Sequence, residues 1–253
     1  MEKQVINMEA TLFCGQTFAW YKEGAAYHAV LQARHIVIPL ENALPTILDD
    51  PLLFHYFDMG WEYEKAERHL SNLDPHLFRL LAQYRSIHIL NQDPWEVLIS
   101  FLLSQNNNIK RIRSMYTTLS KRYGDEVDES VFAFPRVDQV SGVDETTFRE
   151  LGMGFRAPYL ISAIEHAGVL DRIPSLEYLQ AKELLKEIRG VGEKVASCIL
   201  LFGFHHMEAF PLDTWMLKVM KRYYPEKDAS YFAPYAALAQ QYLFHGERMG
   251  GSL

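Results

Sequence analysis

The sequence predicts an α+β protein, with a small antiparallel β-sheet domain at the N-terminus followed by a mostly α-helical body. Three observations support this fold class. Short β-branched and aromatic runs fill residues 11–40, helical periodicity dominates from Ala43 onward, and a two-glycine corner joins two helices at about residues 181–203. We divide the chain into an N-terminal domain, 1–75, and a helical body, 76–253.

The N-terminal strands are predicted from their β-branched and aromatic residues. Thr17–Tyr21 is followed by the turn signal Lys22-Glu23-Gly24, and Tyr27–Leu31 comes next. His35–Ile38 continues the series until Pro39 ends it. Brief polar breaks between such runs indicate an antiparallel meander, and we expect no strand after about residue 60.

The helical body begins with a clear start signal. Asp93 is a predicted N-cap and Pro94 occupies the first helical position. Apolar residues then recur at i, i+3, i+4 and i+7 over Trp95–Leu102. Further periodic segments cover Ile109–Tyr123, Glu145–Leu151, Pro158–Val169, Leu176–Ile188, Thr214–Tyr223 and Tyr231–Phe244.

Length and composition are those of an ordinary globular protein. The 253 residues are 49% hydrophobic and 23% charged, which is enough to bury a full core. The sequence has no run of eighteen apolar residues, and its start lacks the apolar core of a signal peptide. We therefore expect a monomer without membrane contact, in the cytoplasm or nucleoid of a bacterium or the nucleus of a eukaryote.

The net charge of −7 argues against a general nucleic-acid binder, because such domains are usually basic. The basic residues are nevertheless unevenly distributed, with clusters in 110–122 and 186–194. An enzyme that must release its product can make few phosphate contacts and keep its other faces acidic. If the chain binds nucleic acid, we expect modest affinity with strong salt dependence.

The cysteines limit the possible metal sites. Only Cys14 and Cys198 are present, and two thiolates cannot hold a four-cysteine iron–sulfur cluster or zinc site.

The corner around residue 191 carries the strongest motif. Helical spacing up to Ile188 is broken by Gly190-Val191-Gly192, and a second helix is predicted to begin at Glu193 and to be stopped by Gly203. Unpaired N–H groups of the hairpin and of the new helix would point outward together and could bind a phosphate. Lys194 lies in the first turn, beside such a phosphate.

This motif resembles those of the 8-oxoguanine DNA glycosylases, a branch of the helix-hairpin-helix glycosylases. The resemblance rests on GVGEKVASC at 190–198 and FPLD at 210–213, with 213 − 194 = 19 residues between lysine and aspartate. It extends from about Leu12 to Phe244. The two cysteines exclude the cluster-bearing branches of the superfamily in their cluster-bearing form.

The resemblance implies how the reaction proceeds. Lys194 would attack C1′ of the deoxyribose and form a Schiff base, after which β-elimination can cut the strand. Asp213, which is also a plausible helix N-cap, would stabilise positive charge on the sugar. No cofactor is required, although the carbonyls of Lys186, Ile188 and Val191 could hold a monovalent cation that bridges to a phosphate.

The same resemblance implies a pocket for the extruded base. The carbonyl of Gly15 would accept N7–H, which oxidised guanine has and guanine lacks. Cys198 and Phe244 would stack on the two faces of the base, and Gln240 would read its Watson–Crick edge. Taken singly, each residue is more simply explained by core packing or a polar surface; their joint occurrence in this order favours the pocket.

The remaining contacts are implied on the DNA side. Asn106 and Arg111 would fill the gap and read the orphaned base, for which cytosine is the expected partner. Phe155 would act as the wedge in the base stack, with Arg156 beside the estranged base. The hairpin glycines, Gly190 and Gly192, would let a phosphate approach the backbone. The expected partner is thus double-stranded DNA containing oxidised guanine.

Three positions depart from the family pattern. Trp215 stands where a histidine is usual, Arg189 where proline is common, and Glu193 where a small polar residue is common. Two alternatives to the main hypothesis are kept. One is an alkylpurine glycosylase that works with aspartate and water alone, and the other is a non-catalytic helix-hairpin-helix module that only binds DNA.

Overall fold

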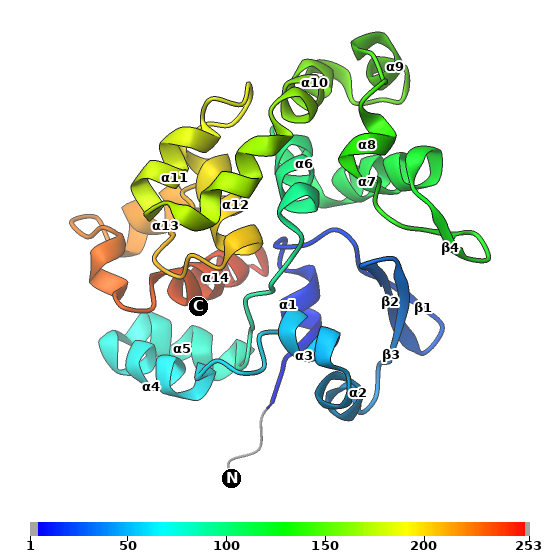
Figure 1. The fold of residues 1–253 in the computed structure, drawn as a ribbon. Coiled ribbons are helices and arrows are strands. Elements are labelled where there is room, and N and C mark those ends of the chain that lie inside the picture. Colours follow the sequence, from blue (N-terminus) through cyan, green and yellow to red (C-terminus); the bar gives the residue numbers. More distant parts are fainter. Residues whose placement is uncertain (1–4, 251–253) are drawn as a thin grey trace.

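The computed structural model describes residues 5–250 and confirms the predicted fold class (Figure 1). A small antiparallel sheet near the N-terminus packs beside a mostly helical body. Within residues 5–250, no helix combines the length and the apolarity needed to cross a membrane. The division of domains at residue 75 stays a prediction.

The elements follow one another in a simple order. The strands are β1 (Tyr21–Glu23), β2 (Ala26–Leu31), β3 (Arg34–Pro39), β4 (Glu126–Asp128) and β5 (Val131–Phe132). The α-helices are α1 (Met8–Phe13), α2 (Ala43–Asp49), α3 (Pro51–Tyr56), α4 (Tyr63–Leu73), α5 (Pro75–Tyr84), α6 (Pro94–Ser104), α7 (Ile109–Tyr123), α8 (Val137–Val140), α9 (Glu145–Glu150), α10 (Ala157–Glu165), α11 (Tyr178–Leu185), α12 (Glu193–Phe204), α13 (Thr214–Tyr223) and α14 (Ala236–Arg248). The 3₁₀ helices are η1 (Gly154–Arg156), η2 (Ala167–Ser175) and η3 (Ala229–Phe232).

The first sheet has the antiparallel order β1-β2-β3. Tyr27 of β2 lies opposite Ile38 of β3, and both are buried. Ala29 lies opposite Ile36, and both are buried as well. Alternate residues therefore cover the core, as the two-residue period of a half-buried strand requires.

The predicted strand at Thr17–Tyr21 is wrong, because β1 begins only at Tyr21. Phe18 and Trp20 are buried in irregular backbone, and the Trp20 indole N–H donates to Tyr56 Oη at 3.0 Å. These aromatic residues are used for core packing, and β-propensity alone cannot distinguish this use from strand pairing.

A second sheet contradicts the expectation of no strand after residue 60. β4 and β5 pair antiparallel, with Glu126 opposite Phe132. Strands of this length are too short for a two-residue period to be visible in the sequence. His35 of β3 contacts Asp128 of β4 at 2.8 Å and links the two sheets.

Several predicted helices are confirmed. Ile109–Tyr123 and Thr214–Tyr223 coincide with α7 and α13. Asp93 caps α6 by accepting the N–H of Glu96 at 2.9 Å, and Pro94 is the first residue of that helix.

Two predicted helices have different ends. The Pro158–Val169 segment is α-helical only to Glu165, after which the chain continues as η2. The Tyr231–Phe244 segment is interrupted at Pro234, because proline has no N–H to continue a helix. α14 accordingly begins at Ala236.

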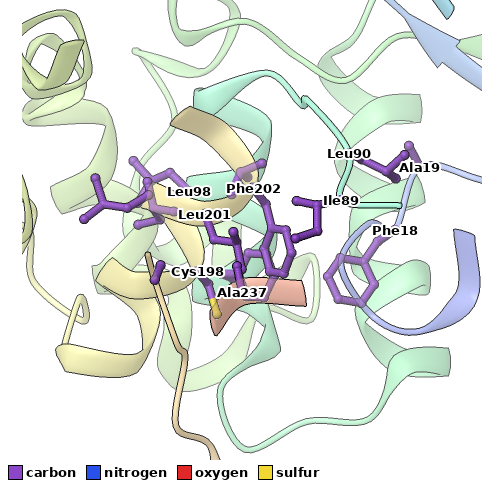
Figure 2. Close-up of a cluster of buried hydrophobic side chains, with 14 of the residues drawn as sticks. Phe18, Ala19, Ile89, Leu90, Leu98, Cys198, Leu201, Phe202 and Ala237 are labelled. Atoms are coloured by element: carbon purple, nitrogen blue, oxygen red, sulfur yellow. The ribbon is translucent and has the colours of Figure 1, made fainter. Parts of the chain in front are cut away.

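The core of the body lies between α6 and α12, which pack side by side (Figure 1). Phe101 of α6 stacks on Phe202 of α12 with ring centroids 5.4 Å apart. Figure 2 shows the surrounding cluster, which includes Phe18, Ile89, Leu90, Leu98, Cys198, Leu201 and Ala237. Each large apolar side chain buried here contributes about 1.5–3 kcal/mol, so α12 is held firmly in position.

Glu96 is a partly buried acidic group at the start of α6. Its carboxyl accepts a hydrogen bond from Tyr116 Oη at 3.0 Å. Burial raises the pKa of Glu96 to about 8, and the Asp93 carboxylate adds to the rise. In the unfolded chain the Glu96 carboxyl loses its proton near pH 4.5, whereas in the folded protein it keeps the proton up to about pH 8. The free energy of unfolding therefore falls as pH rises from 4.5 to 8.

We expect Glu96→Gln to unfold at a higher temperature than wild type at pH 8 and at nearly the same temperature at pH 4. Glutamine keeps an acceptor for Tyr116 and removes the ionisation. Each kcal/mol regained raises the melting temperature by about 2–4 °C in a chain of this size. Thermal unfolding of both proteins between pH 4 and pH 8.5 measures the difference, and parallel curves would contradict a neutral buried Glu96.

Candidate active site

The corner between α11 and α12 is longer than the sequence predicted. α11 ends at Leu185, before the predicted end at Ile188, and residues 186–192 form the turn. Gly203 does not stop α12: it stays within the helix, where a Cβ would lie 3.1 Å from Pro94 Cα. The C-cap is His205 in a left-handed conformation, with φ 56°.

The two glycines of the corner have different functions. Gly190 has φ +92°, and a Cβ there would lie 2.5 Å from Cγ of the Tyr159 ring. Gly192 has an ordinary φ of −100°, and a Cβ there would meet nothing within 4 Å. The turn therefore requires glycine at 190 but not at 192, where the missing side chain only leaves open space in front of α12.

Two of the hairpin N–H groups form hydrogen bonds within the protein. The N–H of Arg189 donates to Ser162 Oγ at 3.0 Å, and that of Val191 donates to the carbonyl of Ile188 at 2.9 Å. These two N–H groups are therefore not among the unpaired groups that could bind a phosphate. The arginine at 189 is also explained, because proline could not make this bond. The N-cap of α12, Gly192, offers no side-chain cap to the first turn, whose N–H groups remain for an anion.

A cavity of about 330 Å³ opens beside the start of α12. Its walls include every residue predicted for catalysis or base binding, namely Gly15, Lys194, Cys198, Asp213, Gln240 and Phe244. The rings of Phe18, Phe101 and Phe202 add an apolar wall continuous with the core. A concave, mainly aromatic site with a few convergent polar groups is typical of small-molecule recognition.

Lys194 and Asp213 enter the cavity from the starts of two helices. Lys194 lies in the first turn of α12 with Nζ 4.9 Å from the centroid of the Phe101 ring. Asp213 is the N-cap of α13, and its Oδ1 accepts the N–H of Trp215 at 3.0 Å and of Met216 at 2.8 Å. Both cap hydrogen bonds end on Oδ1. The cap therefore fixes the direction of the carboxylate, and Oδ2 takes no part in the capping.

Cys198 lies one turn after Lys194 and is 3% exposed. Burial raises the pKa of the Cys198 thiol to about 11, although the neighbouring Lys194 ammonium acts to lower it. The residue is therefore a neutral, polarisable thiol, suited to contact a flat ring rather than to attack it.

A chain of hydrogen bonds orients the Gln240 amide. Gln240 Nε2 donates to the carbonyl of Pro211 at 3.2 Å, and Gln240 Oε1 accepts from Gln241 Nε2 at 2.6 Å. The Cys14 thiol donates in turn to Gln241 Oε1 at 3.4 Å. This role of Gln241 could not be predicted from the sequence, because a buried glutamine that aligns another has no sequence signature.

The three asparagines after α6 have three different functions. Asn106 takes a left-handed conformation, φ 47°, at the turn. Asn107 Nδ2 donates to the carbonyl of Leu103 at 2.9 Å, and Asn108 caps α7 by accepting the N–H of Arg111 at 3.0 Å. Arg111 is exposed, but neither it nor Asn106 lines the cavity. The structure thus locates these two beside the pocket, at the surface.

Arg156 is buried in the free protein, and its position beside the estranged base stays a prediction. It is 2% exposed, and its guanidinium donates to the carbonyls of Gln105 (Nε, 3.0 Å) and Asn106 (3.0 Å). The guanidinium also lies 4.3 Å from the centroid of the Phe155 ring. Phe155 itself is 46% exposed, as a wedge residue has to be. Arg156 thus holds the Gln105–Asn106 backbone in place.

Gln105 joins these loops to the hairpin. Its Nε2 donates to the carbonyl of Gly190 at 3.0 Å, while its own carbonyl accepts from Arg156. The asparagine loop, the Phe155 loop and the hairpin are therefore one connected surface. This role of Gln105 could not be predicted from the sequence, since its partner is 85 residues away.

Glu193 carries a negative charge at the place where a phosphate is expected. Its carboxylate pairs with Lys182 Nζ at 2.7 Å and Lys186 Nζ at 2.5 Å. These lysines lower the pKa of Glu193 to about 2. The acidic residue therefore neutralises two hairpin lysines in the free protein.

Two further residues line the cavity. Trp215 is 42% exposed at its edge, with Lys218 Nζ 5.1 Å from the centroid of the indole ring. Arg248, from the last turn of α14, donates to the carbonyl of Cys14 at 2.8 Å. Arg248 was not among the site residues predicted from the sequence.

Comparison with known families divides the chain into two matched regions. Residues 1–98 match the 8-oxoguanine DNA glycosylase N-terminal domain, and residues 99–238 match the HhH-GPD superfamily of base excision DNA repair proteins.

Individual relatives agree with these matches. The N-glycosylase/DNA lyase OGG1 of Arabidopsis thaliana is 30% identical over 86% of this chain, and an N-glycosylase/DNA lyase of Saccharomyces cerevisiae is 32% identical over 69%. The chain spans 66% and 49% of the lengths of these two relatives. An 8-oxoguanine glycosylase/lyase of Clostridium acetobutylicum, solved with double-stranded DNA containing cytosine opposite 8-oxoG, superimposes with a TM-score of 0.86 at 29% identity, covering 98% of this chain and 93% of that one.

We expect Gly190→Ala and Gly192→Ala to separate folding from DNA binding. Gly190→Ala should lower stability by about 2–5 kcal/mol, because a left-handed alanine also clashes with Tyr159. Gly192→Ala should change stability by less than about 0.5 kcal/mol yet weaken duplex binding, since its methyl group would stand where a phosphate approaches. Urea unfolding and fluorescence anisotropy measure the two effects, and equal destabilisation by both variants would contradict the assignment.

We expect Glu193→Gln to bind undamaged duplex DNA more tightly than wild type, because Lys182 and Lys186 become free to contact phosphates. The slope of log K against log salt should steepen by about 1–2, at roughly 0.9 per added phosphate contact. Binding titrations at several salt concentrations measure this, with Glu183→Gln as the matched control because Glu183 pairs with Lys186 alone. An unchanged slope in Glu193→Gln would mean that these lysines do not face the DNA.

Proposed function

Because the chain belongs to the HhH-GPD superfamily of base excision DNA repair proteins, and within it to the 8-oxoguanine DNA glycosylases, we propose that it excises 8-oxoguanine from duplex DNA and cleaves the abasic strand. The observation that carries this proposal is the cavity in which Lys194 and Asp213 meet Cys198 and Phe244. It offers an amine, a carboxylate and the two sides of a stacking site in one concave space.

The damaged nucleotide must leave the stack, because C1′ is not accessible within a duplex. The Lys194 amine attacks C1′, and the base departs with the electron pair of the N-glycosidic bond and takes up a proton. The Asp213 carboxylate, held by its cap, stabilises positive charge that develops on the sugar. Ring opening gives a Schiff base, and loss of a C2′ proton then expels the 3′ phosphate.

The base is held by groups on several sides. The Gly15 carbonyl accepts N7–H, Cys198 and Phe244 cover the two faces, and Gln240 addresses the Watson–Crick edge. The fixed amide of Gln240 supports this role, because an amide with a defined orientation reads donors and acceptors selectively.

The partner is double-stranded DNA with cytosine opposite the lesion. Asn106 and Arg111 fill the gap and contact the orphaned base, while Phe155 wedges into the stack. The exposure of both Phe155 and Arg111 supports this arrangement. Arg156 lies beside the estranged base, and its hydrogen bonds to the carbonyls of Gln105 and Asn106 also hold the loop in place.

The carbonyls of Lys186, Ile188 and Val191 fit a monovalent cation by chemical type, because backbone oxygens are ligands for hard cations. One of them, that of Ile188, already accepts the N–H of Val191 within the turn. A cation there would bridge the hairpin to a phosphate and is not needed for the lysine chemistry.

Incubation with an 8-oxoguanine·cytosine duplex and borohydride tests the proposed function. We expect wild type to release the base and to be trapped as a covalent adduct, because borohydride reduces a Schiff base. Lys194→Gln should lose the adduct and at least about 10³-fold in rate. Asp213→Asn should keep its cap but lose about 10²- to 10³-fold in excision.

Each alternative gives a different result in that experiment. Base release without an adduct would indicate an aspartate-and-water alkylpurine enzyme. Binding without turnover, unaffected by Asp213→Asn, would indicate a non-catalytic module.

A further inference from the structure

Arg248 is a cation in the base cavity that the proposed chemistry does not use. It comes from the last turn of α14, one turn after Phe244, and its guanidinium lies 5.5 Å from the centroid of the Phe244 ring. A guanidinium has five N–H donors in a rigid plane. One of them, on a terminal nitrogen, donates to the carbonyl of Cys14 at 2.8 Å, which fixes the group against the residue preceding Gly15.

The guanidinium lies directly beside Gly15. A Cβ at Gly15 would be 3.3 Å from the same terminal nitrogen of Arg248 and 3.6 Å from the Phe244 ring. Gly15 has φ +103°, so glycine both permits this backbone and leaves the space between ring and guanidinium open. Arg248 and Phe244 thus border the same part of the cavity.

The charge of Arg248 is not neutralised by a neighbouring acid within residues 5–250, where none of the ion pairs includes it. Its field reaches the interior, since it contributes to lowering the pKa of Arg113 and of His245, secondary to burial in both cases. A partly buried cation with spare donors at a cavity wall is suited to bind an acceptor.

The chemistry of the oxidised purine identifies that acceptor. In 8-oxoguanine, N7–H lies between two carbonyl oxygens, O6 and O8. If the Gly15 carbonyl accepts N7–H, the Arg248 guanidinium immediately beside Gly15 can donate a hydrogen bond to one of those two oxygens. The base also gains negative charge as the glycosidic bond breaks, and a nearby cation stabilises that charge more in the transition state than in the bound substrate.

We propose that Arg248 is a further specificity-determining residue. It donates a hydrogen bond to one of the two carbonyl oxygens that flank N7 of the extruded purine, and it stabilises the departing base. This inference rests on the proposed function. It adds a positively charged contact to a pocket otherwise formed by a backbone carbonyl, an amide and two stacking groups.

Single-turnover excision of 8-oxoguanine by Arg248→Met tests the proposal. Loss of one charge-assisted hydrogen bond should slow base release by about 10- to 100-fold. Arg248→Lys should recover part of the rate, because lysine keeps the charge but not the planar fork. Arg222→Met is the matched control, since Arg222 is an exposed arginine on α13 that does not line the cavity.

A second substrate distinguishes a base contact from a structural role. A duplex with a preformed abasic site has no base for Arg248 to contact, so Arg248→Met should cleave it at close to the wild-type rate. An equal loss on both substrates would overturn the proposal, as would wild-type excision by Arg248→Met. Inactivity of the wild type on 8-oxoguanine would instead refute the proposed function itself.

A third measurement separates the purine from a phosphate. Affinity for a duplex carrying a tetrahydrofuran abasic analogue, and its salt slope, should be the same for Arg248→Met and wild type. A weaker affinity with a slope reduced by about 1 would show that Arg248 contacts the DNA backbone, and the proposal would fail.

Discussion

The close contact between Gly190 and the Tyr159 ring is the constraint on which the site depends. No residue with a Cβ fits there, because the added atom would lie 2.5 Å from the ring. The contact seats the hairpin on α10, and the Gly190 carbonyl then accepts from Gln105 at 3.0 Å. The Gln105 carbonyl in turn accepts from Arg156, so hydrogen bonds link Gly190 to the asparagine loop after α6 and to the loop that carries Phe155. The fold thus aligns three surface segments through one small residue.

The core and the cavity are parts of a single packed structure. Phe101 stacks on Phe202 inside the body and also forms the wall near Lys194. Burial that stabilises α6 against α12 therefore also directs the amine and keeps the Cys198 thiol neutral. A helix that carries a reactive lysine needs such anchoring, because catalytic geometry tolerates little displacement.

The charges around the site differ from the net charge of the chain. The chain is acidic overall, with a net charge of −7. At the hairpin, Glu193 holds Lys182 and Lys186 in ion pairs, so a phosphate at the proposed site would meet helix N–H groups rather than free lysines. Arg248, in contrast, keeps its charge inside the cavity.

The sequence alone determined the fold class, the helix starts at Asp93 and Asp213, and six of the residues that line the cavity, because caps, periodicity and an ordered motif are local signals. It could not show that Arg156 is buried or that Gly192 has an ordinary φ, since both depend on what packs against them. The short strands β4 and β5 were missed for lack of a period. Only the tertiary structure could bring Gln105 to Gly190, Gln241 to Gln240 and Arg248 to Gly15, because a hydrogen bond between distant segments depends on packing and has no pattern along the chain.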